Sequence, residues 1–246
     1  MKSLLKANYL KTSSAMIVFI MAVAFIACGG NGGKDAPGST LSMKVDMSAL
    51  AKTAGDTVII ESAKLLLKSI KFKTDVEDSL DYKVGPFIVN LDLNGGITQI
   101  AANDIPNGTY DEIKFKIHKP EDDEAVSDTD FVAGATSDER YSIVIRGTYN
   151  GSPFMYRSKK DIEQELEINP PLVVTDSTND VNATLLVAPA GWFMKDGNYL
   201  DPSNESNRED IDDNIKRSFK KAMKDNDHDG DENDLDDDDD HEDDDH

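Results

Sequence analysis

Short stretches in which apolar and polar residues alternate recur along most of this chain. Residues 41–48 read Leu-Ser-Met-Lys-Val-Asp-Met-Ser, and residues 113–117 read Ile-Lys-Phe-Lys-Ile. A period of two places successive side chains on opposite faces of an extended strand, so each stretch predicts a half-buried β-strand. Because this period is far commoner here than the helical one, the sequence favours a mainly β fold.

Turn signals separate the predicted strands. Asn150-Gly151 stands between two apolar runs and predicts a hairpin with a type I′ turn. Ile105-Pro106-Asn107-Gly108 favours a second turn, since proline fixes φ and glycine tolerates a positive φ. About eight short strands with such turns are typical of a single antiparallel β-sandwich of the immunoglobulin or transthyretin type. We expect them at residues 41–48, 63–73, 87–93, 110–117, 141–149, 153–157, 162–168 and 181–188, with 57–60 as a further short candidate.

Three irregularities interrupt this pattern. The alternation changes phase near Lys68 and Ser69, which predicts a β-bulge. Pro170-Pro171 is expected to end the strand that starts at Ile162. Residues 119–139 are polar and acidic without alternation, so we expect a long loop there.

One amphipathic helix is expected after the strands. Ser206 and Glu209 have the spacing of a capping box, in which hydroxyl and carboxylate bond each other's free backbone N–H groups. The spacing predicts a helix that continues to Lys224 and packs on the sheet with Trp192 and Phe193; binding of a partner is the alternative. Its apolar stripe consists of Ile211, Ile215, Phe219 and Met223.

The N-terminus predicts export and a lipid anchor. Lys2, Lys6 and Lys11 precede an apolar run from Ala15 to Ala27, which is shorter than the roughly 20 residues of a membrane-spanning helix. Phe25-Ile26-Ala27-Cys28 resembles the bacterial lipobox, with Phe25 at a position where leucine is usual. The resemblance implies diacylglyceryl transfer to the Cys28 sulfur and cleavage before Cys28. A plain secreted protein and an uncleaved membrane anchor remain alternatives.

These signals divide the chain into five predicted parts. They are a lipoprotein signal peptide at 1–27, a flexible Gly/Asn/Ser/Pro-rich tether at 28–40, the β-sandwich at 41–190, a loop and helix at 191–224, and an acidic tail at 225–246. The expected location is the bacterial cell envelope, at the outer membrane or cell surface, with the membrane contacted through lipid on Cys28. Cys28 is the only cysteine, so no intramolecular disulfide can form and the core alone must stabilise the domain.

The negative charge of the chain is concentrated at its C-terminus. Of the 48 acidic residues, 15 lie in residues 225–246, which contain no lysine or arginine. The remaining 33 acidic and 26 basic residues leave the body only mildly acidic. Such a chain offers no basic face for phosphates, which excludes nucleic acid as a partner.

The sharpest chemical motif begins this tail, at Asp225-Asn226-Asp227-His228-Asp229-Gly230. Oxygen ligands at positions 1, 3 and 5 with glycine at position 6 are typical of loops that wrap calcium. Glu232 at the usually apolar position 8, and aspartate rather than glutamate at position 12, depart from a paired EF-hand. The motif therefore resembles the single calcium loops of dockerin-like and thrombospondin type 3 sequences. The predicted ligands are Asp225, Asp227, Asp229, Asp231, Asn233 and Asp236.

Two alternatives to a defined, non-catalytic calcium protein stay open. A disordered tail so rich in aspartate matches this motif by composition alone. A surface hydrolase or carbohydrate-binding accessory needs exposed aromatics, for which Tyr149, Phe154 and Tyr156 are candidates. No zinc-protease spacing or nucleophile elbow occurs, and we expect no catalytic residues; the acidic run 121–124 indicates a solvated loop. A calcium-responsive adhesin or assembly factor, with a protein or glycan ligand, is a further hypothesis.

A family resemblance rests on three segments. They are residues 41–73, Phe87-Ile88-Val89-Asn90-Leu91, and Ile105-Pro106-Asn107-Gly108-Thr109-Tyr110. Together they resemble an uncharacterised family of bacterial β-sandwich lipoproteins, in which a "V-x-L"-like strand end precedes a "P-x-G-x-Y" turn. The resemblance covers about a third of the chain and implies an envelope location and a sandwich fold. It implies no activity and no catalytic residues.

Overall fold

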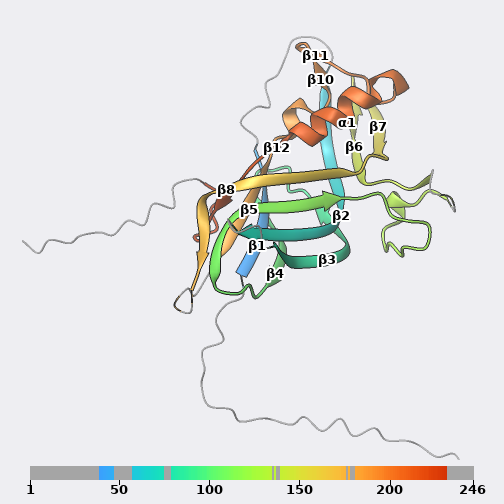
Figure 1. The fold of residues 1–246 in the computed structure, drawn as a ribbon. Coiled ribbons are helices and arrows are strands. Elements are labelled where there is room, and N and C mark those ends of the chain that lie inside the picture. Colours follow the sequence, from blue (N-terminus) through green and yellow to red (C-terminus); the bar gives the residue numbers. More distant parts are fainter. Residues whose placement is uncertain are drawn as a thin grey trace, which may run out of the picture. The chain divides into compact units, whose positions relative to one another are not determined.

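Strands dominate the structure, a computed structural model that describes residues 39–46, 57–74, 79–134, 136, 139–175, 177 and 181–231 (Figure 1). The prediction of a mainly β fold is confirmed. The strands are β1 (Ser39–Val45), β2 (Val58–Thr74), β3 (Ser79–Asn90), β4 (Ile97–Asn103), β5 (Gly108–Ile117), β6 (Ile143–Tyr149), β7 (Ser152–Ser158), β8 (Ile162–Val174), β9 (Asn182–Val187), β10 (Met194–Lys195), β11 (Asn198–Tyr199) and β12 (Phe219–Lys224). The predictions for Cys28 and for the signal peptide lie outside the described residues. No helix in the described ranges has the length and apolar character needed to cross a membrane.

Most strands belong to one mixed sheet, with the order β4-β1-β9-β12-β8-β5-β2-β6-β7 and with β3 paired to β2. The pairs β1·β9 and β12·β8 are parallel, so the expectation of a purely antiparallel sheet is wrong. The reason is that β12 returns after the helix and inserts between β9 and β8, antiparallel to the former and parallel to the latter. β10 and β11 form a separate two-stranded sheet.

The sheet curls, so that two parts of it enclose one main core. One part consists of β4, β1, β9 and β12, and the other of β8, β5, β2, β6 and β7. In Figure 1, β1 and β4 cross behind β2, β5 and β8. The Phe115 ring on β5 lies 5.0 Å from the Phe219 ring on β12, in an edge-to-face contact. Leu41 and Leu185 are fully buried in the same cluster. Burial of this apolar surface is the main force that stabilises the curled sheet.

β2 is a single long strand where the sequence predicts two shorter ones. Its pairing shifts register between Leu67 and Ser69, which confirms the predicted bulge. Leu65, Leu66 and Leu67 are all buried, although they occupy both faces of the strand. Leu66 is covered by Phe131 from the loop that follows β5. The described residues of the segment 119–139 therefore form a loop, as predicted, with a short 3₁₀ turn at Thr129–Phe131, and they pack a buried aromatic residue against the sheet.

The predicted hairpin is confirmed, whereas the predicted end of the next strand is wrong. Asn150 and Gly151 adopt φ values of 52° and 79° between β6 and β7, the left-handed region that a type I′ turn requires. β8 runs on through Pro170-Pro171 to Val174. Its pairing with β5 shifts register between Tyr110 and Glu112, and the prolines lie opposite this shift. Residues opposite a bulge need not donate a backbone N–H to the neighbouring strand. The two prolines, which have no such N–H, therefore do not end β8.

The C-terminal helix is shorter than predicted. α1 spans Arg208–Arg217, and its buried Ile211 and Ile215 join the core cluster of Trp192 and Phe193 as expected. Phe219 and Met223 are also buried, but from β12 rather than from a helix. The gap between β9 and β8 offers backbone partners on both sides of this segment, and sheet pairing therefore replaces the last helical turns.

The predicted capping box is also absent. Ser206 lies within a short 3₁₀ helix, Glu205–Asn207, and the Asn204 side-chain oxygen accepts its backbone N–H at 3.0 Å. α1 begins directly after this turn without a side-chain cap. The side-chain cap lies one element upstream, at Asn204, where the Ser206 hydroxyl also donates to Asn204 Oδ1 at 2.8 Å.

Candidate cation-binding loop after β12

The loop after β12 begins with a fully buried carboxylate, that of Asp225. Asp225 Oδ1 accepts the backbone N–H of Gly230 at 3.0 Å, and Oδ2 accepts from Asn182 Nδ2 at 3.1 Å. Thr184 Oγ1 also donates to Oδ2. A buried charge is costly unless it is hydrogen-bonded, and here three neutral donors supply that bonding.

The rest of the loop folds around this carboxylate through turns made by its own aspartates. Asp227 Oδ1 accepts the N–H of Asp229 at 3.3 Å, and Asp229 Oδ1 accepts the N–H of Asp231 at 2.7 Å. These contacts from side chain to backbone two residues on are Asx turns. The short-range propensity of aspartate thus produces the same tight winding that a calcium loop requires.

Gly230 occupies a position that favours glycine. Its φ is +72°, and an added Cβ would lie 2.3 Å from Lys44 Cδ. A side chain there would be strained in its backbone and would require the Lys44 side chain to move. Local geometry therefore favours the glycine at position 6 of the motif.

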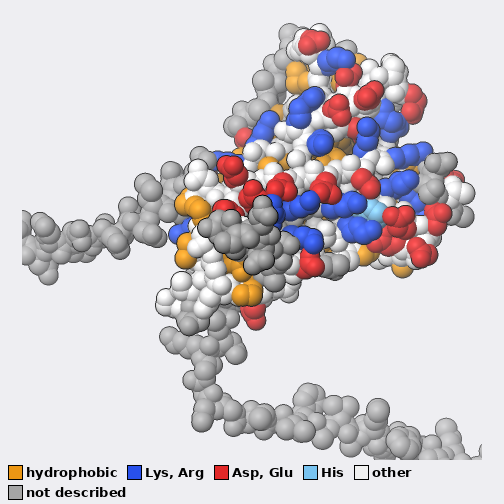
Figure 2. Space-filling model, viewed as in Figure 1, with side chains coloured by type: hydrophobic (Ala, Val, Ile, Leu, Met, Phe, Trp, Pro, Cys, Tyr) orange, Lys and Arg blue, Asp and Glu red, His pale blue; other side chains and the backbone are white. Residues whose placement is uncertain are grey.

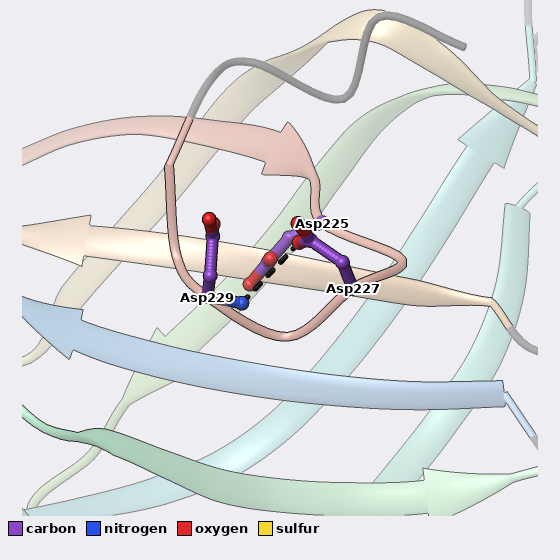
Figure 3. Close-up of side chains that lie close together, drawn as sticks. All are labelled: Asp225, Asp227 and Asp229. Carbon is purple, nitrogen blue, oxygen red and sulfur yellow. Dashed lines mark hydrogen bonds between the residues drawn. The ribbon is translucent and has the colours of Figure 1, made fainter. Parts of the chain in front are cut away.

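Three of the predicted ligands come together. One carboxylate oxygen from each of Asp225, Asp227 and Asp229 lies within 4.8 Å of the others, and Figure 3 shows the three side chains within the curve of the loop. Asp227 and Asp229 are exposed, whereas Asp225 is buried. Oxygen-only ligand sets with net negative charge suit hard cations such as calcium. Asn233 and Asp236 lie outside the described residues.

The fourth predicted ligand faces a lysine. Lys44 Nζ donates to Asp231 Oδ1 at 3.2 Å and to the carbonyl oxygens of Asp229 and Gly230 at 3.0 and 3.1 Å. The Asp231 carboxylate is therefore outside the group of three, and its carbonyl remains as the atom that position 7 would offer. Lys44 comes from β1, far away in sequence, so no local pattern indicates this contact.

A second charged cluster surrounds His118, the buried residue after β5. Its Nε2 lies 2.9 Å from Glu124 Oε2 and 3.5 Å from Lys68 Nζ, whereas its Nδ1 lies 3.6 Å from Asp161 Oδ2. Glu121 Oε1 also lies 3.9 Å from Nε2, so two of the three carboxylates are near one ring nitrogen and the third is near the other. This cluster is therefore poorly arranged to hold a single ion.

Rows of opposite charge cover the outer face of β2, β5 and β8 (Figure 2). Lys73 Nζ lies 2.5 Å from Glu112 Oε2 and 2.6 Å from Glu165 Oε1, and Lys114 pairs with Glu163. The hydrogen bonds that the Lys73 ammonium donates to the Glu112 and Glu165 carboxylates raise its pKa. Since these charges neutralise one another across neighbouring strands, the face presents no single-sign field for a ligand.

The aromatic candidates for glycan binding do not form an exposed strip. Phe154 and Tyr156 are buried, and both rings pack edge-to-face on Phe193. The Tyr156 hydroxyl donates to Asp212 Oδ1 at 2.7 Å, which ties β7 to α1. Tyr149 is half-buried. The hairpin therefore uses these rings for its core, and a stacking platform for sugars is not available there.

Comparisons with known proteins identify no family for this chain. The sequence matches no protein-family model, and no curated protein matches it. Among solved structures, this chain is similar to MbnP from Methylosinus trichosporium, with a TM-score of 0.33 and 10% sequence identity, over 69% of this chain and 80% of that chain.

Proposed function

We propose that this protein is a lipid-anchored component of the bacterial envelope whose loop at residues 225–231 binds calcium. The observation that carries the calcium assignment is the approach of three carboxylates, from Asp225, Asp227 and Asp229, to within 4.8 Å. Like charges at this separation repel, and a divalent cation among them would relieve the repulsion. The expected affinity is that of extracellular calcium modules, with Kd about 10⁻⁴–10⁻³ M.

The same proposal describes the β domain as a non-catalytic binding or structural module. Its support is the use of the aromatic rings in the core and the mutual neutralisation of the charged face. We also propose that the curled sheet is a sandwich of the immunoglobulin or transthyretin type, which the Phe115–Phe219 contact between its two halves supports. An experimental structure with the two sheets closed over the core tests that fold type.

Calorimetry on the full chain tests the calcium site. A variant with Asp227→Ala and Asp229→Ala removes two exposed ligands and leaves buried Asp225 in place. We expect the binding heat of the wild type to disappear in this variant. The matched control is Asp122→Ala with Asp123→Ala, which removes two exposed aspartates from the loop after β5. Equal heats for all three proteins would show only loose attraction of calcium to negative charge.

The lipid anchor is tested separately. Cys28→Ser removes the sulfur that would be acylated, and we expect the protein to leave the membrane fraction while its unfolding midpoint stays unchanged. Fractionation of cells and mass spectrometry of the N-terminal peptide measure these outcomes. A Cys28→Ser variant that stays in the membrane fraction to the same extent would contradict the assignment.

A further inference from the structure

A cluster of buried polar side chains lies between the start of β1 and the loop after β12. Its members Asn182, Thr184 and Ser42 are each at most 1% exposed. They lie on adjacent strands, β9 and β1, in a sheet whose other buried residues are mostly apolar. Buried polar groups of this kind are retained when every partner is satisfied, and they then fix one arrangement of the surrounding elements.

The carboxamide of Asn182 is the centre of this cluster. Its Oδ1 accepts from Thr40 Oγ1 at 2.9 Å and from Ser42 Oγ at 3.2 Å. Its Nδ2 donates to the Asp225 carbonyl at 2.8 Å and to Asp225 Oδ2 at 3.1 Å, with Thr184 Oγ1 at 3.2 Å. Both lone-pair positions of the oxygen and both N–H groups are therefore engaged.

The orientation of this amide is dictated by its neighbours. Asp225 presents only acceptors, its carbonyl and its carboxylate, so the nitrogen of Asn182 must face the loop. The hydroxyls of Thr40 and Ser42 then donate to the oxygen on the other side. A rotated amide would place its oxygen against the Asp225 carboxylate, which like partial charges disfavour.

The backbone carbonyls of residues 181 and 182 also bond β1 on one side and the loop on the other. Thr40 N–H donates to the Val181 carbonyl at 2.7 Å, and Asp225 N–H donates to the Asn182 carbonyl at 2.9 Å. In the described part of the chain, no side-chain hydrogen bond joins Thr40 or Ser42 directly to Asp225. The start of β1, at residues 39–42, therefore meets the loop through residues 181–182, whereas Lys44 further along β1 contacts the loop directly.

We infer that Asn182 couples the loop at residues 225–231 to the start of β1, where the chain enters the domain. A displacement of Asp225 withdraws the acceptors of Nδ2, and the released amide then loosens its bonds to Thr40 and Ser42. The coupling works in both directions, because linkage between two sites is reciprocal. It holds whether or not the loop binds a cation. If the proposed calcium binding is correct, the metal would act on β1 through this amide.

Hydrogen exchange on the full chain, followed by mass spectrometry, tests the coupling. Asp225→Ala is expected to raise exchange in residues 39–43 about tenfold and to leave the β6–β7 hairpin unchanged. The matched control is Asp229→Ala, an exposed residue of the same loop that does not touch Asn182; it is expected to leave residues 39–43 unchanged. An unchanged β1 in Asp225→Ala, or equal acceleration in the hairpin, would overturn the inference.

The reverse direction provides a second test that does not depend on the folding of Asp225→Ala. Thr40→Val with Ser42→Ala removes both donors to Asn182 Oδ1 and should raise exchange of the Gly230 amide, which is bonded to Asp225 Oδ1. Thr98→Val on β4, beside Met43 of β1, is the control for loss of a hydroxyl near this strand. If the control and the double variant change Gly230 equally, Asn182 is not the link.

Discussion

Two acidic segments of this protein, residues 119–140 and residues 225–231, look alike in sequence and differ in structure. In the first, Asp130 is bonded to Lys64 at 2.8 Å and to both terminal nitrogens of Arg146, and Phe131 beside it is fully buried. In the second, the carboxylates of Asp227 and Asp229 face each other and the buried Asp225.

The difference lies in the cations that the fold brings to each segment. β2 and β6 supply Lys64 and Arg146 to the first, where both pair with the carboxylate of Asp130. β1 supplies only Lys44 to the second, and Lys44 contacts Asp231 and two carbonyls rather than the three converging aspartates. The first segment is thereby tied to β2 and β6 by ion pairs, whereas three aspartate carboxylates of the second converge on one another. Aspartate content alone does not separate these cases.

The largest expected effect concerns the buried aromatic ring in the first segment, residues 119–140. Phe131→Ala removes a fully buried ring that covers Leu66 and Val144, and we expect a loss of about 3–4 kcal/mol in unfolding free energy. Urea denaturation measures it. Val132→Ala, at a half-buried neighbouring position, should cost clearly less. A loss below about 1 kcal/mol for Phe131→Ala would mean that the loop is held by its ion pairs instead.

Asp225→Ala tests the buried carboxylate of the second segment. We expect a loss of about 2–3 kcal/mol, because Gly230 N–H and the side chains of Asn182 and Thr184 each lose an acceptor. Exposed Asp227→Ala is expected to change the unfolding free energy by less than about 0.5 kcal/mol. Equal losses for the two variants would show that the buried position of Asp225 has no special role in stability.

Asp130→Asn tests the ion pairs of the first segment through their pH dependence. Hydrogen bonds from Arg146, and then from Lys64, hold the pKa of Asp130 well below its usual range. A lowered folded-state pKa stabilises the protein fully above the unfolded value of about 3.9, and this stability is lost as pH falls through lower values. We expect a gap of about 1–2 kcal/mol between wild type and Asp130→Asn at pH 7, after allowance for solvent screening.

The gap should shrink progressively when urea unfolding is repeated below pH 4, because the Asp130 carboxylate then takes up a proton in the unfolded state while it stays ionised in the folded state. Asp123→Asn, an exposed residue of the same loop, is the matched control and should show no gap at either pH. A gap for Asp130→Asn that stays constant with pH would indicate lost packing rather than lost charge.

Lys44→Met gives the smallest expected effect on stability, below about 1 kcal/mol, because its bonds to the loop are partly exposed. Its effect on the proposed calcium site should be clearer. Loss of a positive charge beside the loop is expected to tighten calcium binding several-fold, as measured by calorimetry. Lys71→Met, on β2, serves as the charge-matched control. Weaker calcium binding in Lys44→Met would show that the ammonium holds the loop in its binding shape.

The local parts of this fold could be predicted from the sequence, and the non-local parts could not. Period-two alternation located β1 and β5, and the Asn150-Gly151 turn located the hairpin, because each depends on neighbouring residues. β12 was predicted as helix because Phe219 and Met223 continue the spacing of α1. This segment forms a strand because it pairs with β9 and β8, which are distant in sequence.

The candidate site likewise has a local part that the sequence predicts and non-local contacts that it does not. The motif from Asp225 to Gly230 is contiguous, and three of its aspartates do converge. Asn182, Thr184 and Lys44 had no signal in the sequence, since an asparagine, a threonine and a lysine within strands are unremarkable there. β4 was missed because its alternation is interrupted where the register with β1 shifts between Leu41 and Ser42.

The position of β12 also determines when this chain can fold. It occupies an interior place in the sheet, between β9 and β8, although it is the last strand of the described chain, and β1 is paired with the late strand β9. A nascent chain therefore cannot complete its sheet until residue 224 is free to pair, and such distant pairings form slowly. Under the proposed export across a membrane, this late completion of the sheet would delay folding until the last strand has crossed.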